Sequence, residues 1–245
     1  MRRCFLALLC AQACAAAGAQ DLTVSAAASL GDALRAIAPG FVARHPGARL
    51  RLNLASSGQL LQQIAQGAPA DVFASADAET MDRAAAQGLI DPATRHDFTR
   101  NRLVLVAPPD SSWHGLASLA SPAVQRVAIG KPATVPAGRY AQQVLEAARL
   151  WDALAPKRVP ADHVRQVLDY VARGEVDAGF VYQSDALAAG RRVRVVQLLQ
   201  GHAPIHYPVA VVQGSSQPRL AQAFVDYLRS PGAQALLQQK GFGSP

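Results

Sequence analysis

The organisation of the chain is clearest at Val24-Ser25-Ala26-Ala27-Ala28-Ser29-Leu30, where a strand pattern ends and a helix pattern begins. Residues 21–25 alternate apolar and polar side chains and include Val and Thr, which indicates a strand. After them, apolar residues recur with helical spacing at Leu30, Ala33, Leu34, Ile37 and Phe41. The sequence therefore predicts a strand that leads directly into a helix.

Ser29 lies at this predicted junction. Its position favours a helix N-cap, with Asp32 three residues later completing a shortened capping box. A helix start preceded by small residues also exposes free backbone N–H groups beside the hydroxyl, and such groups bind anions. Taken alone, Ser29 is better explained as a cap than as an anion ligand.

The same pattern occurs a second time. Residues 48–55 alternate as a strand, Ser56-Ser57-Gly58-Gln59 follows, and a helical pattern then runs from Leu60 until Gly67. Alternating strands and helices predict an α/β fold with a parallel or mixed sheet. In such sheets ligands bind beyond the carboxyl ends of the strands, where both serines are expected.

Later segments predict a second lobe. Strands are expected at 127–130 and 176–182, with helices that begin near Ala137 and Val164. Apolar strands near 105 and 207 predict two crossings between lobes, and the two C-terminal helices then pack back on the first lobe. We expect lobe 1 to comprise 21–104 with 207–245, and lobe 2 to comprise 105–206. Two lobes joined by two strands can hinge.

Residues 1–20 have the pattern of a secretory signal peptide: Arg2 and Arg3, a short apolar run, and small residues before the expected cleavage site. The three cysteines, Cys4, Cys10 and Cys14, fall within this segment. The exported protein is therefore expected to have no disulfide, no thiol chemistry and no cysteine metal site.

The remaining chain is mildly basic, with 22 Lys and Arg against 17 Asp and Glu. Its cationic residues are scattered except for Arg191-Arg192-Val193-Arg194, which lacks interleaved aromatics and is interpreted as a solvated edge. Nucleic-acid binding is not expected. A positive surface helps to steer small anions toward the protein.

Enzyme motifs are absent from the sequence: there is no G-x-S-x-G, P-loop, G-x-G-x-x-G or H-E-x-x-H. His202 and His206 are separated by Pro204 and have no third ligand nearby, which argues against a metal site. Asp71 and Asp77 are better explained as acidic residues of turns and caps than as paired catalytic carboxylates.

Neutral hydrogen-bond donors recur instead at the predicted junctions. Ser29 and Ser57 offer hydroxyls, Ala137 and Val164 lie at helix starts with free backbone N–H groups, and Tyr182 ends a strand with a phenol. Such donors hold a buried dianion when every oxygen is hydrogen-bonded, since each bond to a charged group contributes roughly 1.5–3 kcal/mol.

These motifs carry a family resemblance that extends in order over essentially the whole exported chain. The segments are Ala26-Ala27-Ala28-Ser29-Leu30, Ala55-Ser56-Ser57-Gly58, Gly67-Ala68-Pro69-Ala70-Asp71-Val72-Phe73-Ala74-Ser75-Ala76-Asp77, Val135-Pro136-Ala137-Gly138-Arg139-Tyr140-Ala141, Gly179-Phe180-Val181-Tyr182-Gln183-Ser184-Asp185 and Tyr207-Pro208-Val209-Ala210-Val211-Val212. Together they resemble the periplasmic molybdate-binding proteins of molybdate ABC transporters, which are bacterial extracellular solute-binding proteins.

The resemblance implies a type II two-lobe periplasmic binding protein, expected to be monomeric. It would bind molybdate or tungstate in the interlobe cleft, deliver the anion to an inner-membrane permease, and need no cofactor; molybdenum would enter only as the oxyanion. The family's contacts, two serines, two backbone N–H groups and a tyrosine, carry over onto Ser29, Ser57, Ala137, Val164 and Tyr182.

Three positions depart from the family pattern. Gly58 stands where the family often has another serine, Lys131-Pro132 where it often has Asp-Pro, and Arg139 where it has an apolar residue. Lys131 and Arg139 are expected to make the rim of the cleft more positive, which affects the finer preference among anions.

Three alternatives stay open at this stage. A receptor for sulfate or another tetrahedral anion would use the same donors. An enzyme with Ser29 or Ser57 as nucleophile would need a base at a recognisable spacing, which the sequence lacks. A ligand-sensing regulator is disfavoured by the export signal and by the lack of a DNA-binding segment.

Overall fold

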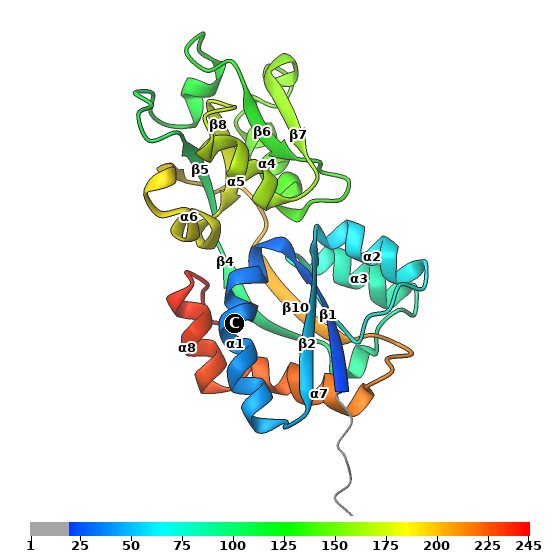
Figure 1. The fold of residues 1–245 in the computed structure, drawn as a ribbon. Coiled ribbons are helices and arrows are strands. Elements are labelled where there is room, and N and C mark those ends of the chain that lie inside the picture. Colours follow the sequence, from blue (N-terminus) through cyan, green and yellow to red (C-terminus); the bar gives the residue numbers. More distant parts are fainter. Residues whose placement is uncertain (1–19) are drawn as a thin grey trace, which may run out of the picture.

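The computed structural model describes residues 20–245. They form two lobes, each built around a five-stranded sheet, as Figure 1 shows. The predicted signal peptide lies outside the described residues except for Gln20, which begins the first strand. Among the described residues, no helix has the length and apolarity that crossing a bilayer requires.

Lobe 1 contains the sheet β2-β1-β3-β10-β4. The strand β1 is parallel to both β2 and β3, whereas β10 is antiparallel to its two neighbours. The strands of this sheet are β1 (Gln20–Ala27), β2 (Ala48–Ala55), β3 (Val72–Ala74), β4 (His96–Asn101) and β10 (Ile205–Val211). The first two match the strands expected from the alternating pattern.

Helices cover both faces of this sheet. The strand β3 is apolar on both faces, because its successive side chains point to opposite sides and all are apolar. Val72 and Ala74 pack in one apolar cluster together with helices α1, α7 and α8, while Phe73 packs in a second cluster with α2 and α3. The helices of lobe 1 are α1 (Gly31–Arg44), α2 (Ser57–Ala65), α3 (Ala78–Ala86), α7 (Pro218–Leu228) and α8 (Pro231–Gln239). The C-terminal helices therefore pack on lobe 1, as expected.

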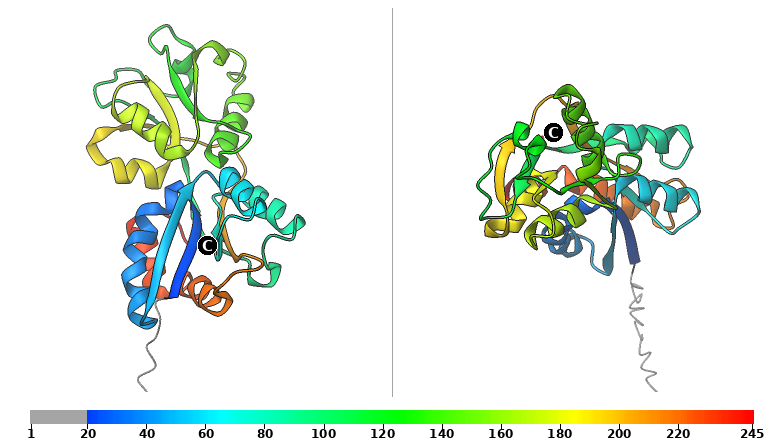
Figure 2. Two further views of the ribbon diagram at one scale, coloured as in Figure 1. Left: turned by 45° about the vertical axis from the view of Figure 1, so that its right-hand side comes forward. Right: turned by 90° about the horizontal axis from the view of Figure 1, so that it is seen from above.

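Lobe 2 repeats this plan in the sheet β7-β6-β8-β5-β9, in which β6 is parallel to both β7 and β8, whereas β5 is antiparallel to its two neighbours. Its strands are β5 (Leu103–Ala107), β6 (Val127–Gly130), β7 (Arg158–Ala161), β8 (Ala178–Tyr182) and β9 (Arg194–Leu198). Its helices are α4 (Pro136–Ala147), α5 (Val164–Ala172) and α6 (Gln183–Ala189). Figure 2 shows the two lobes from two further sides.

The chain crosses between lobes twice, near the two places expected, but the boundaries differ by a few residues. The expected boundary between 104 and 105 falls inside β5, which pairs entirely within lobe 2, so the first crossing is at Arg102. The second crossing lies between β9 and β10, because β10 already pairs with β4 of lobe 1 at Ile205. Strand pairing, which hydropathy does not reveal, sets these limits.

Candidate functional site

A small pocket lies between the lobes, with a cavity volume of about 10 Å³. All five residues predicted from the sequence as ligand contacts line it. The lining comprises Ala27, Ala28, Ser29, Ala55, Ser56, Ser57 and Ala76 from lobe 1, and Val135, Pro136, Ala137, His163, Val164 and Tyr182 from lobe 2. Each of these residues lies at or near the carboxyl end of a strand or the start of a helix.

Ser29 does not cap a helix, contrary to the expectation. Residues Ala28–Leu30 form a short 3-10 turn, and α1 begins after it with Leu30 at the N-cap and no side-chain cap. The Ser29 hydroxyl is instead hydrogen-bonded to the Tyr207 hydroxyl at 2.9 Å, and both residues are fully buried. A tertiary hydrogen bond therefore replaces the local one.

Two neighbouring serines begin α2 and have different partners. Ser56 is the N-cap of a capping box in which Gln59 Oε1 accepts the Ser56 backbone N–H at 3.3 Å, and the same oxygen accepts the Ser56 hydroxyl at 2.8 Å. The Ser57 hydroxyl oxygen accepts the backbone N–H of Ala76 at 3.0 Å. Because its oxygen accepts that bond, the Ser57 proton remains available for an acceptor in the pocket.

Lobe 2 contributes two helix N-termini to the pocket. Ala137 lies in the first turn of α4 and Val164 begins α5, so neither backbone N–H has an intrahelical partner. The partial positive charge of a helix start also favours an anion there. Pro136 precedes Ala137 at a position where the missing N–H of proline costs nothing.

Tyr182 ends β8 and is 1% exposed. Its hydroxyl is buried and has no hydrogen-bond partner among the described residues. Burial raises the pKa of Tyr182 well above its usual value, as do the nearby Tyr207 hydroxyl and carboxylates, so the phenol keeps its proton. A buried hydroxyl without a partner is costly unless a ligand accepts its hydrogen bond.

The pocket itself carries little positive charge. Of the described residues that line it, only His163 can become cationic, and burial lowers its pKa below the usual value. The neutral His163 ring accepts the backbone N–H of Gln166 through Nδ1 at 3.1 Å, which caps α5. The pocket is therefore lined by neutral donors.

Lys131 and Arg139 do not make the rim positive as expected, because each is paired with an acid. Lys131 pairs with Asp162 at 2.5 Å on the surface of lobe 2. Arg139 of α4 reaches across to lobe 1, where it pairs with the buried Asp77 and donates to Thr80 Oγ1 at 2.8 Å. Arg139 therefore connects the lobes and contributes no free charge.

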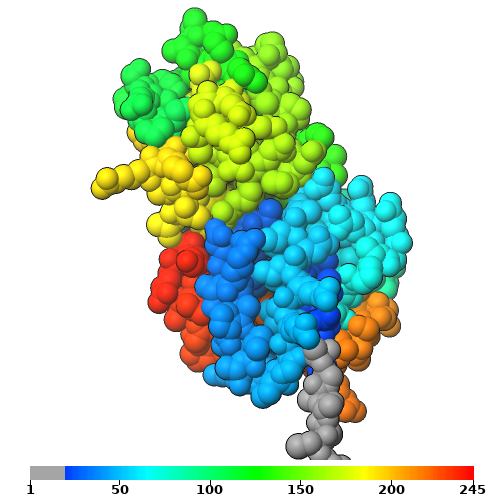
Figure 3. Space-filling view, in the orientation of Figure 1, coloured from blue at the N-terminus to red at the C-terminus, as the bar shows by residue number. Residues whose placement is uncertain are grey.

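Gly58 allows a second close contact between the lobes. Its N–H donates to the carbonyl of Thr134 at 2.9 Å. A Cβ at this position would lie 2.7 Å from Thr134 backbone atoms, which is too close for any side chain. The glycine that departs from the family pattern thus lets the loop before α4 rest on α2, and Figure 3 shows the two lobes in contact on one face.

A third contact between lobes surrounds Arg165, the residue after Val164. Its guanidinium lies 2.8 Å from Asp32 of lobe 1 and 2.6 Å from Asp185 of lobe 2. Burial raises the pKa of Asp185 to about 6, and the charge of Arg165 opposes that rise. Arg165 is thus neutralised from both lobes.

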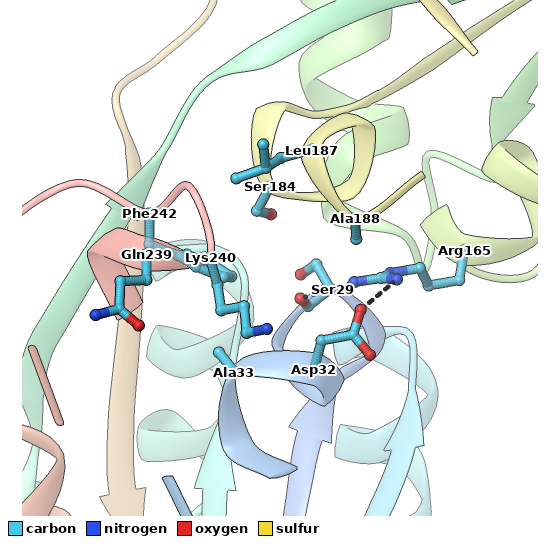
Figure 4. A pocket seen from close by; sticks show the side chains of 10 residues that line it. All are labelled: Ser29, Asp32, Ala33, Arg165, Ser184, Leu187, Ala188, Gln239, Lys240 and Phe242. Carbon is cyan, nitrogen blue, oxygen red and sulfur yellow. Dashed lines mark hydrogen bonds and ion pairs between the residues drawn. The ribbon is translucent and has the colours of Figure 1, made fainter. Parts of the chain in front are cut away.

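Arg165 also borders a larger hollow of about 460 Å³, which Ser29 lines as well. Figure 4 shows Arg165 and Asp32 joined there, with Lys240 pointing into the space from the end of α8. The hollow shares Ser29 with the pocket between the lobes but contains none of the other four predicted ligand contacts.

Sequence reasoning missed Tyr207 and Asn101, which lie behind Ser29. Asn101 Nδ2 lies 3.3 Å from the Tyr207 hydroxyl and 2.8 Å from the Ser184 hydroxyl of lobe 2. The available signals were an aromatic at the start of a predicted strand and an amide just before a predicted crossing. Neither signal identifies its partner, since Ser29 and Tyr207 are 178 residues apart.

The acidic residues considered for catalysis have structural roles. Asp71 accepts the backbone N–H of Thr23 at 2.8 Å and the Ser215 hydroxyl at 2.7 Å. Asp77 caps α3 by accepting from Thr80 N–H at 3.3 Å. Within residues 20–245, no group of three or more His, Cys, Asp and Glu is arranged to hold a metal ion.

The fold and this pocket define the class of protein. Residues 22–243 match the model of the family described as bacterial extracellular solute-binding protein, and the chain belongs to that family. It is 41% identical to the molybdate-binding protein ModA of Escherichia coli over 90% of this chain and 88% of the relative. The predicted family is confirmed, and the chain is a solute-binding protein rather than an enzyme.

Solved structures agree with this assignment. The periplasmic molybdate-binding protein of Azotobacter vinelandii superposes with a TM-score of 0.81 at 25% identity, covering 91% of this chain and 99% of that one. The sulfate-binding protein SubI from Mycobacterium tuberculosis superposes with a TM-score of 0.79 at 21% identity, over 91% and 86%. The second comparison shows a shared fold alone, so the choice of anion must be argued from the site.

Proposed function

We propose that this protein captures molybdate, or the isostructural tungstate, in the periplasm and delivers it to the permease of an ABC transporter at the inner membrane. Ser29, Ser57, Ala137, Val164 and Tyr182 are the proposed contacts. The observation that carries the proposal is the Tyr182 hydroxyl, which is buried beside two serine hydroxyls and has no partner within residues 20–245. The names of the relatives support the choice of molybdate.

The chemistry of the pocket favours a fully deprotonated oxyanion. The oxygens of molybdate and tungstate at neutral pH accept hydrogen bonds and donate none, and the proposed contacts offer hydroxyl and N–H donors. A protonated anion such as hydrogen phosphate would need an acceptor for its own proton. No carboxylate lies among the described residues that line the pocket, so phosphate should bind less well.

Closure of the lobes links capture to delivery in this proposal. Arg139, Gly58 and Arg165 each contact the opposite lobe, so the closed arrangement presents a surface made from both lobes. The permease would recognise that surface, while the open form would exchange ligand with the periplasm. We propose that the protein acts as a monomer, since the proposed contacts all come from one chain.

Isothermal titration with molybdate, tungstate, sulfate and phosphate tests the choice of anion. We expect molybdate and tungstate to bind one to one with dissociation constants of about 1 μM or lower. Tyr182→Phe should weaken binding roughly 10- to 100-fold, since it removes a hydrogen bond to a charged group and leaves the ring in place. Saturable binding of sulfate without binding of molybdate would overturn the proposal.

A further inference from the structure

Ser29 belongs to a row of buried, hydrogen-bonded polar side chains that continues through Tyr207 to Asn101. The Tyr207 hydroxyl lies 2.9 Å from Ser29 Oγ, and Asn101 Nδ2 lies 3.3 Å from the Tyr207 hydroxyl. Ser29 and Tyr207 are each 1% exposed or less, and Asn101 is 9% exposed. Water therefore has little access to reorient these groups.

The donor and the acceptor of each hydrogen bond in this row follow from the Asn101 amide. Asn101 Oδ1 accepts the backbone N–H of Arg102 at 2.9 Å, so its Nδ2 must face Ser184 and Tyr207. An amide nitrogen only donates, so the Tyr207 oxygen accepts from Asn101. The Tyr207 proton then points to Ser29, whose oxygen accepts it.

From this order we infer that Asn101 and Tyr207 are positioning residues that orient the Ser29 proton toward the anion. Ser29 Oγ already accepts from Tyr207, so its own proton is directed into the pocket. Without this arrangement the Ser29 hydroxyl would be free to donate to Tyr207 and present only lone pairs to the anion, which repel its oxygens. The inference rests on the proposed role of Ser29 as an anion contact.

This row of hydrogen bonds also connects the site to the crossing between the lobes. Asn101 is the last residue of β4, directly before the crossing at Arg102, and it donates to Ser184 of lobe 2 at 2.8 Å. Burial raises the pKa of Tyr207 well above its usual value, so the phenol stays protonated and can donate. The Tyr207 ring packs edge-on against Tyr182 and Phe242, so loss of the hydroxyl alone leaves the packing in place.

The test compares Tyr207→Phe, Ser29→Ala and the double variant by titration with the tetrahedral anion that the unmodified protein binds. We expect Tyr207→Phe to weaken binding about tenfold. In the Ser29→Ala background the same change should have almost no effect, because the hydroxyl that it orients is gone. Tyr227→Phe is the matched control, since Tyr227 packs against Phe41 outside the pocket and its change should leave affinity unchanged.

A purely structural role for Tyr207 would lower the melting temperature of the ligand-free protein and weaken binding equally in both backgrounds. That result, or an unchanged affinity of Tyr207→Phe, would overturn the inference.

Asn101→Asp gives a second test: its carboxylate accepts where the amide donates, so the Tyr207 proton turns away from Ser29 and affinity should again fall about tenfold. Which anion the unmodified protein binds tests the proposed function. The differences in affinity among the variants test the inference about Tyr207 and Asn101.

Discussion

Ser56 and Ser57 are adjacent serines with separable roles, which gives a matched pair of substitutions. Ser57→Ala should weaken binding of the anion by roughly 1–3 kcal/mol, because a donor to a charged group is lost. Ser56→Ala should instead lower the free energy of unfolding by about 1 kcal/mol through loss of the α2 cap. Calorimetric titration and urea unfolding of both variants measure the two effects. Equal affinity losses would contradict the assignment of Ser57 as the ligand contact.

For single residues, the sequence predicted correctly which side chains line the same pocket, but it did not predict the hydrogen-bond partner of each one. The five predicted residues share one pocket because each lies at a strand end or helix start, and those junctions converge in this fold. The cap predicted for Ser29 is wrong because Tyr207, far away in the sequence, supplies a better partner. The partner of Arg139 was likewise invisible, since Asp77 lies 62 residues away on the other lobe.

At the level of elements, His163 makes the N-terminus of α5 sensitive to pH. Its neutral Nδ1 accepts the N–H of Gln166, and burial lowers the pKa of His163 below its usual value. The unfolded chain therefore binds the proton more readily, and this contribution to stability is present above about pH 6.5. It is lost as the pH falls through the lowered pKa of the folded state.

His163→Asn should reduce this pH dependence, because an Asn side chain caps a helix without titrating near neutrality. Unfolding by urea at pH 7.5 and pH 5 measures the difference for both proteins. We expect a smaller loss of stability in acid for the variant than for the unmodified protein. An identical loss in both would show that the His163 cap does not contribute.

Strands and helices were predicted with good accuracy where the period of the apolar residues agrees with the Gly, Pro and capping residues at the ends of the element. Residues 48–55 match β2, and the two C-terminal helices match α7 and α8 closely. The lobe boundaries were displaced because they depend on which sheet each strand joins. Alternation along the chain shows that a strand exists but does not reveal its neighbours.

For the whole molecule, the pairing of Arg139 with Asp77 should control how long the closed form persists. Arg139→Met should accelerate dissociation of the anion at least about tenfold, because breaking a buried ion pair leaves the carboxylate uncompensated. Lys131→Met is the matched control, since its pair with Asp162 is exposed and lies within lobe 2. Stopped-flow measurement of dissociation by intrinsic fluorescence compares the two, and equal rates would contradict a closing role for Arg139.

We propose that one tetrahedral oxyanion binds in the pocket between the lobes. Anomalous diffraction at the molybdenum edge from crystals grown with molybdate tests it most directly. We expect a single strong peak within hydrogen-bonding reach of the Ser29, Ser57 and Tyr182 hydroxyls. A peak in the larger hollow beside Lys240 and Arg165, or no peak in the pocket, would contradict it.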